Sequence, residues 1–205
     1  GIPYDSEKAL VLAEELGGFI ERIAWDESHN LAVQRGPYPE YERSALKERG
    51  LPPVRNSSVI TIAPTGTISR LAGCSSGIEP HFALAWWSNV LWKDHEGSSS
   101  RLLDTPISIW ESLKDQIGDD ESVRTVLEQI ADDPETAEDI LGQHGLNSDI
   151  FRTSMAIDAE SHVRMQGIWQ KHVTNSVSKT INLPNNATVD DVKEAFELAW
   201  ETDCK

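Results

Sequence analysis

Residues 59–69 read VITIAPTGTIS, and this stretch carries the main sequence signals for the fold and the function of the chain. The β-branched run Val59–Ile62 predicts a short buried strand, and Pro64 follows it as a break. Residues 65–69 then form a turn that carries hydroxyl groups, one glycine and no charge. Surface turns are usually charged or rich in Asn and Gly, so this neutral turn needs a physical explanation.

A small, donor-rich turn between a strand and a helix is a common phosphate-binding arrangement, because backbone N–H groups and the positive helix end face the anion. Here Gly66 permits close backbone approach, and the hydroxyls of Thr65, Thr67 and Ser69 can donate hydrogen bonds. No lysine is present, so the turn is not a P-loop. The residues alone leave two interpretations open, a phosphate-binding turn and an ordinary turn capped by a threonine.

The charge balance excludes several classes of partner. The chain of 205 residues is long enough for one domain with a real core, and it has 34 acidic against 18 basic residues, a net charge of −16. Phosphate contacts need clustered Lys and Arg, so we expect no direct binding to nucleic acid. The same excess of acid argues against an anionic membrane surface.

Much of the acidic excess lies in one segment, Asp115–Asp139. The simplest interpretation is a solvated acidic face of helices. Adaptation to high salt is a second interpretation that composition does not separate from the first.

The N-terminal residues Gly1–Asp5 lack the features of a signal peptide, and no apolar run is long enough for a transmembrane helix. We therefore expect a cytoplasmic location. The chain also begins without Met, which favours an excised piece or a processed product.

Periodicity and capping signals predict a mostly helical chain with two short strands. The first expected helix begins at Asp5 or Ser6 and is stopped by Gly36, and the last, Val189–Glu201, begins after a capping box of Thr188 and Asp191. The other expected helices are Tyr41–Arg49, Ile107–Gln116, Ser122–Ile130, Glu135–His144 and a helix that runs through His162–His172. The expected strands are Val59–Ile62 and Lys179–Leu183. Two strands cannot make a sheet of their own, so they pair with another chain or with sequence not present here.

Other conspicuous residues are interpreted as structural. Trp86, Trp87 and Trp92 favour packing in a core or at a partner interface over base stacking. The two cysteines, Cys74 and Cys204, lie far apart without a CxxC motif, which argues against a disulfide scaffold and a Cys-rich metal site. His162 and His172 lack the i, i+4 spacing of a helical zinc pair, and we expect no metal site.

Three long segments resemble the C-terminal part of the catalytic chain of ribonucleotide reductase, in its adenosylcobalamin-dependent class II form. They are Gly1–Leu16, Thr61–Trp86 and His162–Trp200. The resemblance fades over Lys93–Asn147. We therefore expect residues 1–205 to be the C-terminal part of the reductase barrel domain, with a divergent acidic helical insertion at about 93–147.

The resemblance implies a fold and an activity. The fold is α/β, with this chain as a partial segment of a ten-stranded α/β barrel, mostly helical with a few short barrel strands. The family reduces the ribose 2′-OH of a nucleotide through a thiyl radical. Its substrate phosphates are bound by the residues that match Pro64, Thr65, Gly66, Thr67 and Ile68, and the PTGTI form of this turn favours class II over class I.

The chain departs from the family in its cysteines. It has no Asn-Pro-Cys-x-Glu motif for the radical cysteine and no redox or shuttle cysteine pair, and Cys74 should not inherit a catalytic role. We therefore expect no catalytic residue in this chain, whether it comes from a split gene or an excised fragment. The expected partners are a ribonucleotide, a complementary reductase segment or chain, and further copies of itself; adenosylcobalamin is expected on the complete enzyme.

Two alternatives follow from the missing radical machinery. The chain could be a non-catalytic nucleotide-binding or assembly domain derived from the reductase barrel. It could also be a fragment of a class I or class III reductase, which would not depend on cobalamin.

Overall fold

The computed structural model describes residues 1–91 and 99–205, and the chain divides into two compact units. The first unit consists of Gly1–Tyr4, Thr65–Asp158 and Asn182–Pro184. The second unit consists of Asp5–Pro64, Ala159–Ile181 and Asn185–Lys205. Each unit is built from segments distant in the sequence.

The described elements are mostly helices. The first unit holds α3 (Gly66–Ala72), β1 (Trp86–Leu91), β2 (Ser99–Asp104), α4 (Ile107–Ile117), α5 (Asp120–Asp132), η2 (Pro134–Thr136), α6 (Ala137–Gln143) and η3 (Ser148–Phe151). The second unit holds α1 (Glu7–Arg35), η1 (Tyr41–Arg43), α2 (Ala45–Glu48), α7 (Ala159–His172) and α8 (Val189–Glu201). The expectation of a mostly helical chain is confirmed, and among these residues no helix is long and apolar enough to cross a membrane.

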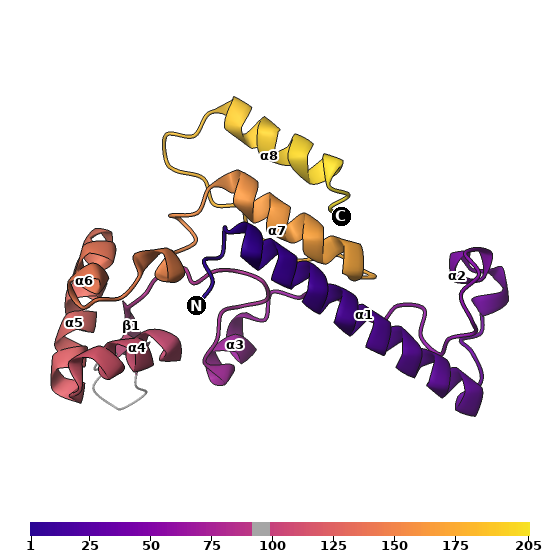
Figure 1. Cartoon of the computed structure of the whole chain (residues 1–205), viewed down its shortest axis with the longest axis horizontal. Helices are drawn as coiled ribbons and strands as arrows, with labels where there is room; N and C mark the ends of the chain where they lie inside the picture. Colours follow the sequence, from indigo (N-terminus) through magenta and orange to yellow (C-terminus); the bar gives the residue numbers. More distant parts are fainter. Residues whose placement is uncertain (92–98) are drawn as a thin grey trace. The chain divides into compact units, whose positions relative to one another are not determined.

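In the second unit α7 lies between α1 and α8 (Figure 1). Local sequence signals define the helix ends. The Ser6 side chain accepts a hydrogen bond from the Ala9 N–H at the start of α1, and Gly36, with φ of 80°, ends the helix. The predicted bounds of α1 and α8 are thereby confirmed, as is the short helical segment after Tyr41.

The contact between α1 and α7 depends on a glycine. Gly17 is buried, and a Cβ atom at this position would lie 2.7 Å from Cδ2 and 3.2 Å from Cβ of His172. At the neighbouring Gly18 the nearest atom of His172 would be 3.5 Å away, an ordinary contact. The backbone of α1 therefore approaches the imidazole of α7 more closely than any larger residue at position 17 would allow.

In place of pairing between the two expected strands, the structure has an isolated parallel bridge between Ile62 and Val177. The Ile62 N–H donates to the Ser176 carbonyl at 3.5 Å, and the Ser178 N–H donates to the Ile62 carbonyl at 2.8 Å. The predicted strand Lys179–Leu183 is wrong, because the bridge forms before it and these residues pair with no neighbour in a sheet. The predicted strand Val59–Ile62 is extended chain that forms a bridge only at Ile62.

Side-chain amides of α7 contribute to this arrangement by satisfying nearby carbonyls. Gln170 is buried, and its Nε2 donates to the carbonyls of Val173 and Asn175 at 3.2 and 2.7 Å. Gln166 Nε2 donates to the Val177 carbonyl at 3.3 Å. Backbone carbonyls need hydrogen-bond partners, and here helix side chains supply some of those that a neighbouring strand would supply.

The core of the first unit lies among β1, α4, α5 and α6. It consists of Leu84, Ala85, Ile109, Leu113, Val123, Val126, Leu127, Ile130, Ala137 and Leu141. On α5 the buried residues recur at i, i+3, i+4 and i+7, while Asp120 and Glu121 are exposed. The acidic segment is thus the solvated face of amphipathic helices, and the three helices predicted here are confirmed.

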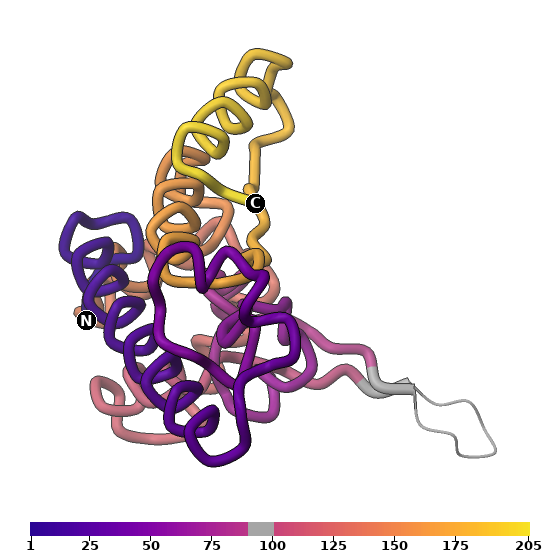
Figure 2. Tube along the Cα trace, turned by 90° about the vertical axis from the view of Figure 1, so that its right-hand side faces the viewer, coloured from indigo at the N-terminus to yellow at the C-terminus, as the bar shows by residue number. Residues whose placement is uncertain are grey.

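The antiparallel pair β1 and β2 was not predicted. The strands run side by side (Figure 2), with Trp87 opposite Leu103. Trp87 is partly buried, its Nε1 donates to Asp132 Oδ1 at 2.7 Å, and the Arg101 guanidinium lies 4.7 Å from its ring centroid. Packing within the unit therefore explains Trp87, whereas Trp92 lies outside the described residues.

A glycine-to-alanine pair tests the close approach of α1 to α7. Gly17→Ala should lower the free energy of unfolding of the full chain by about 1–3 kcal/mol, because the added methyl displaces the imidazole of His172. Gly18→Ala is the matched control and should be neutral or stabilising by up to about 1 kcal/mol, since alanine favours the helix. Urea unfolding measures both, and equal stability of the two variants would contradict the contact.

Candidate functional site

The candidate turn is organised by Thr65, which has φ of 51° and ψ of 25°, in the left-handed region. A β-branched residue seldom adopts this conformation, which costs on the order of 1–3 kcal/mol. Two hydrogen bonds hold it. The Gly77 N–H donates to Thr65 Oγ1 at 2.8 Å, and the Ser69 N–H donates to the Thr65 carbonyl at 2.9 Å in the first turn of α3.

Ser69 lies on the inner side of the turn. It is buried, its hydroxyl donates to the Gly66 carbonyl at 3.2 Å, and its Oγ lies 3.0 Å from Ser76 Oγ. The Cys74 N–H donates to the Ser69 carbonyl at 3.1 Å. The expectation that the Ser69 hydroxyl could bind a phosphate is therefore wrong, because this group holds α3 against the loop that follows it.

The outer side of the turn presents backbone donors. Pro64, Gly66, Thr67 and Ile68 are exposed, and the last three form the start of α3. The first N–H groups of a helix have no partner inside it. A Cβ atom at Gly66 would meet nothing within 4 Å, so an anion can approach the backbone there.

The far end of α3 is fixed to β2 and α4. Arg70 Nη2 lies 2.9 Å from Asp104 Oδ2, and the same carboxylate oxygen accepts the Ser88 hydroxyl. Gly73 ends the helix with φ of 67°, and a Cβ atom there would lie 2.8 Å from Cδ1 of Ile107. The Arg70 charge is thus paired, and the turn itself remains neutral.

Tyr4 fixes the loop that holds Thr65. Its hydroxyl donates to the Ile78 carbonyl at 2.7 Å, next to the Gly77 N–H that Thr65 accepts. Burial, together with the negative charge of Glu79, raises the pKa of the Tyr4 phenol well above its usual value. Tyr4 therefore stays a neutral donor throughout the physiological range.

His172 occupies a separate charged cluster on α1 and α7. Its Nδ1 lies 2.9 Å from Glu21 Oε2, and its Nε2 lies 3.2 Å from Glu14 Oε1. Desolvation would raise the pKa of the Glu14 carboxyl, but the hydrogen bond from Lys171 and the nearby Lys171 and His172 side chains outweigh it and lower this pKa. The cluster joins two helices, which confirms a structural role for His172.

The structure also places His162 and the two cysteines. His162 is fully buried, with its Nδ1 2.6 Å from Lys179 Nζ. Both cysteines are free thiols; Cys74 is exposed, and Cys204 Sγ lies 3.5 Å from Thr202 Oγ1. Within residues 1–91 and 99–205, no group of three His, Cys, Asp or Glu side chains could hold a metal ion.

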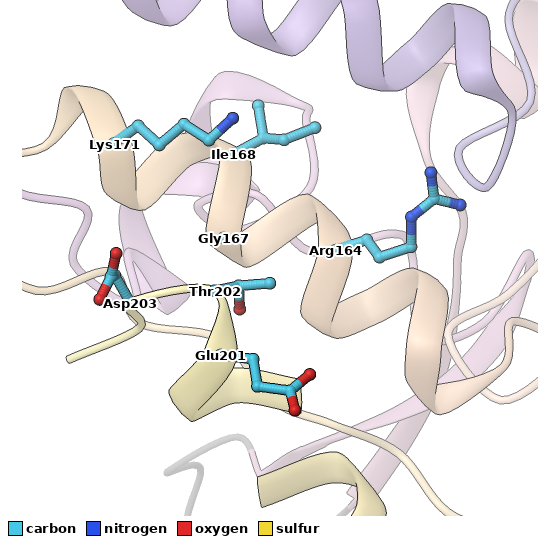
Figure 3. A pocket seen from close by; sticks show the side chains of 7 residues that line it. All are labelled: Arg164, Gly167, Ile168, Lys171, Glu201, Thr202 and Asp203. Carbon is cyan, nitrogen blue, oxygen red and sulfur yellow. The ribbon is translucent and has the colours of Figure 1, made fainter. Parts of the chain in front are cut away.

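A cavity of about 330 Å³ lies between α7 and the end of α8 (Figure 3). It is lined by Arg164, Gly167, Ile168, Lys171, Glu201, Thr202 and Asp203. Arg164 and Lys171 are already paired with Glu7 and Glu14 of α1. Pockets for drug-sized ligands span about 300–1,000 Å³ and adenosylcobalamin is much larger, so this cavity does not fit the cofactor.

Comparison with known proteins identifies the family. The model of the ribonucleotide reductase barrel domain matches residues 46–205, which include the candidate turn, α3, α7 and α8. The chain belongs to the ribonucleotide reductase family. The resemblance carried by the sequence motifs is thereby confirmed.

Curated relatives match the reductase segment along its whole length. Vitamin B12-dependent ribonucleoside-diphosphate reductases from Mycobacterium tuberculosis and Thermoplasma acidophilum are 35% identical over 209 residues and 36% over 206 residues. The alignments cover 100% of this chain but only 28% and 25% of the two relatives. The chain thus spans about a quarter of their length.

A solved structure is similar as well. The Actinobacillus ureae class Id ribonucleotide reductase alpha subunit superposes with a TM-score of 0.64 at 21% identity, covering 100% of this chain and 34% of that one. At this identity the match supports the reductase fold alone.

Three residues that hold the candidate turn were not predicted from the sequence. Ser76 and Gly77 lie in the small-residue loop after α3, and Tyr4 comes from the N-terminal end of the chain. The only sequence signal for the loop was its content of small residues, which does not show what it binds. The Tyr4 contact joins positions 74 residues apart and has no local signal.

Removing the acceptor at Thr65 tests how the turn is held. Thr65→Val keeps the shape but loses the hydroxyl, so the free energy of unfolding should fall by about 0.5–1.5 kcal/mol and the Gly77 amide should exchange faster. Thr65→Ser retains the acceptor and is the control. Urea unfolding and amide hydrogen exchange measure the effects, and unchanged exchange at Gly77 in Thr65→Val would contradict the assignment.

The raised pKa of Tyr4 predicts a pH dependence. Above pH 10.0, the ordinary pKa of a tyrosine phenol, the unfolded chain loses the phenol proton while the folded chain keeps it, so the stability contributed by Tyr4 falls as pH rises. Tyr4→Phe should be less stable than wild type at pH 8, and the difference should shrink above pH 10.0. Urea unfolding at a series of pH values measures the free energy of unfolding, and Tyr38→Phe controls for the loss of a hydroxyl elsewhere. A difference between Tyr4→Phe and wild type that does not change with pH would refute the raised pKa of Tyr4.

Proposed function

We propose that this chain is part of a class II, adenosylcobalamin-dependent ribonucleotide reductase, in which Pro64, Thr65, Gly66, Thr67 and Ile68 bind the phosphates of the ribonucleotide substrate. The observation that carries the proposal is the Thr65 conformation held by the Gly77 N–H, which leaves the start of α3 exposed. Membership of the reductase family and the names of the curated relatives support it.

The chemistry of the turn suits a substrate that must be oriented. Backbone N–H groups and the positive end of a helix attract phosphate oxygens without a side chain that has to be ordered. Fixed donors hold the diphosphate or triphosphate in one position, so that the ribose faces the reacting groups. The open space at Gly66 allows the close approach that such binding requires.

The remaining chemistry is assigned to the rest of the reductase. The chain has no Asn-Pro-Cys-x-Glu motif, and the cavity between α7 and the end of α8 does not fit adenosylcobalamin, which would supply the radical in the complete enzyme. We propose that residues 1–205 complete a ten-stranded α/β barrel together with a complementary segment, the acidic block at about 93–147 being an insertion. A cytoplasmic location stays a prediction from the sequence.

The missing radical cysteine also favours a second function, a non-catalytic nucleotide-binding or assembly domain. Reconstitution separates the two. The chain is mixed with the complementary part of a curated relative, adenosylcobalamin, a dithiol and a nucleotide. Deoxynucleotide formation supports the reductase, whereas nucleotide binding without product in every such mixture supports the second function; activity without cobalamin would indicate another reductase class.

A charge placed on the turn tests phosphate binding. Gly66→Asp should raise the Michaelis constant for the nucleotide about tenfold or more, equivalent to about 1.4 kcal/mol, because the carboxylate repels the phosphates. The fold should tolerate it, since Gly66 has open space. Steady-state kinetics of the reconstituted mixture measure this effect.

Two controls accompany the Gly66 variant. Gly66→Asn has the same shape without the charge and should have a smaller effect. Gly142→Asp adds the charge at another glycine whose Cβ would meet nothing within 4 Å, and it should leave the Michaelis constant unchanged. An unchanged constant in Gly66→Asp would refute the proposed site.

A further inference from the structure

Helix α8 is well capped but buries no side chain. The Thr188 side chain accepts a hydrogen bond from the Asp191 N–H, and the Asp191 side chain accepts one from the Thr188 N–H, which completes a capping box. No residue of Val189–Glu201 is buried. Its attachment to α7 includes the close approach of Gly167 to Thr202, where a Cβ atom at Gly167 would lie 2.8 Å from the Thr202 Cβ.

One side of α8 carries an apolar stripe, defined as Val189, Val192, Phe196 and Trp200. The positions are i, i+3, i+7 and i+11, so they line up along the helix. Their exposed fractions are 85%, 41%, 74% and 80%. Single exposed apolar residues are ordinary, but a continuous line with two aromatic rings indicates a binding surface.

The charges beside the apolar stripe restrict the occupant. Asp190, Glu194, Glu197 and Glu201 lie on the same helix and are exposed, with Lys193 as the one basic residue of α8. Interfacial membrane helices carry Lys and Arg on their polar face, and nucleic acids also need basic residues. The surface therefore fits a protein.

The parallel bridge in the second unit indicates what kind of protein surface would cover the apolar stripe. The Ile62–Val177 bridge is parallel, and α7 and α8 follow one another on either side of Val177 in the sequence. Helices joined to parallel strands cover the face of a sheet with their apolar side. One bridge offers no such face, while the curated relatives contain about three quarters of a reductase beyond the part that this chain matches.

We infer that the apolar stripe of α8 is the surface against which the remaining part of the reductase barrel docks, with Phe196 and Trp200 as the main anchors. The inference rests on the proposed function only in naming a reductase as the partner. Aromatic side chains at the centre of an interface commonly supply most of its affinity.

The test uses the full 205-residue chain and the Mycobacterium tuberculosis relative that lacks the matching region. Isothermal titration calorimetry without nucleotide measures their association. The double variant Phe196→Gln, Trp200→Gln should weaken binding at least about tenfold, as expected for interface anchors. Val33→Gln is the matched control, since Val33 is a 75% exposed apolar residue of α1 in the same unit, and it should bind as wild type does.

Three results would overturn the inference. The first is equal binding by the double variant and wild type. The second is a lower melting temperature of the double variant than of the wild-type chain, both measured without the partner, which would place Phe196 and Trp200 in the core of the chain. The third is a homodimer, seen by analytical ultracentrifugation, that the double variant abolishes, because the stripe would then bind a second copy.

The docking surface and the reductase activity can be refuted independently of each other. A complex that depends on Phe196 and Trp200 but makes no deoxynucleotide refutes the reductase activity and leaves the docking surface intact. An active mixture in which the double variant is as active and binds as tightly as wild type refutes the docking surface and leaves the activity intact.

Discussion

The left-handed conformation of Thr65 is the constraint on which the candidate site depends. It directs the chain out of an extended segment and into α3 within one residue, and the Gly77 N–H stabilises it through the threonine hydroxyl. Because Tyr4 binds the adjacent carbonyl of Ile78, the turn is supported by two other parts of the first unit. Strain at a single residue is retained where the surroundings fix it, and such residues concentrate at functional sites.

Helix prediction succeeded where the signals were local. Ser6 and Gly36 bound α1, the Thr188 capping box begins α8, and the apolar spacing of α5 matches its buried face. Strand prediction failed because a strand exists only through its neighbours. Val59–Ile62 has the composition of a buried strand but forms one bridge, whereas β1 pairs with a segment rich in serine that carries little strand signal.

The sequence predicts where the proposed site lies, but it does not predict the hydrogen bonds that hold the turn. The turn at residues 64–68 follows from an apolar run, a proline and a glycine, and the family resemblance supplied its proposed ligand. Whether a hydroxyl faces outward depends on tertiary contacts: Thr67 is exposed, while Ser69, two residues later, is buried against Ser76. Periodicity gives no information on such contacts, because they join a helix to an irregular loop.

The capping box of α8 has a consequence for assembly. Association costs conformational entropy for every segment that must become ordered, and a helix fixed beforehand avoids much of that cost. Thr188 and Asp191 satisfy the first backbone groups of α8 within the chain itself. A partner that docks on α8 as proposed would meet a helix whose first turn is already capped, and the rate of encounter and the surface presented, rather than coupled folding, would govern how fast the two associate.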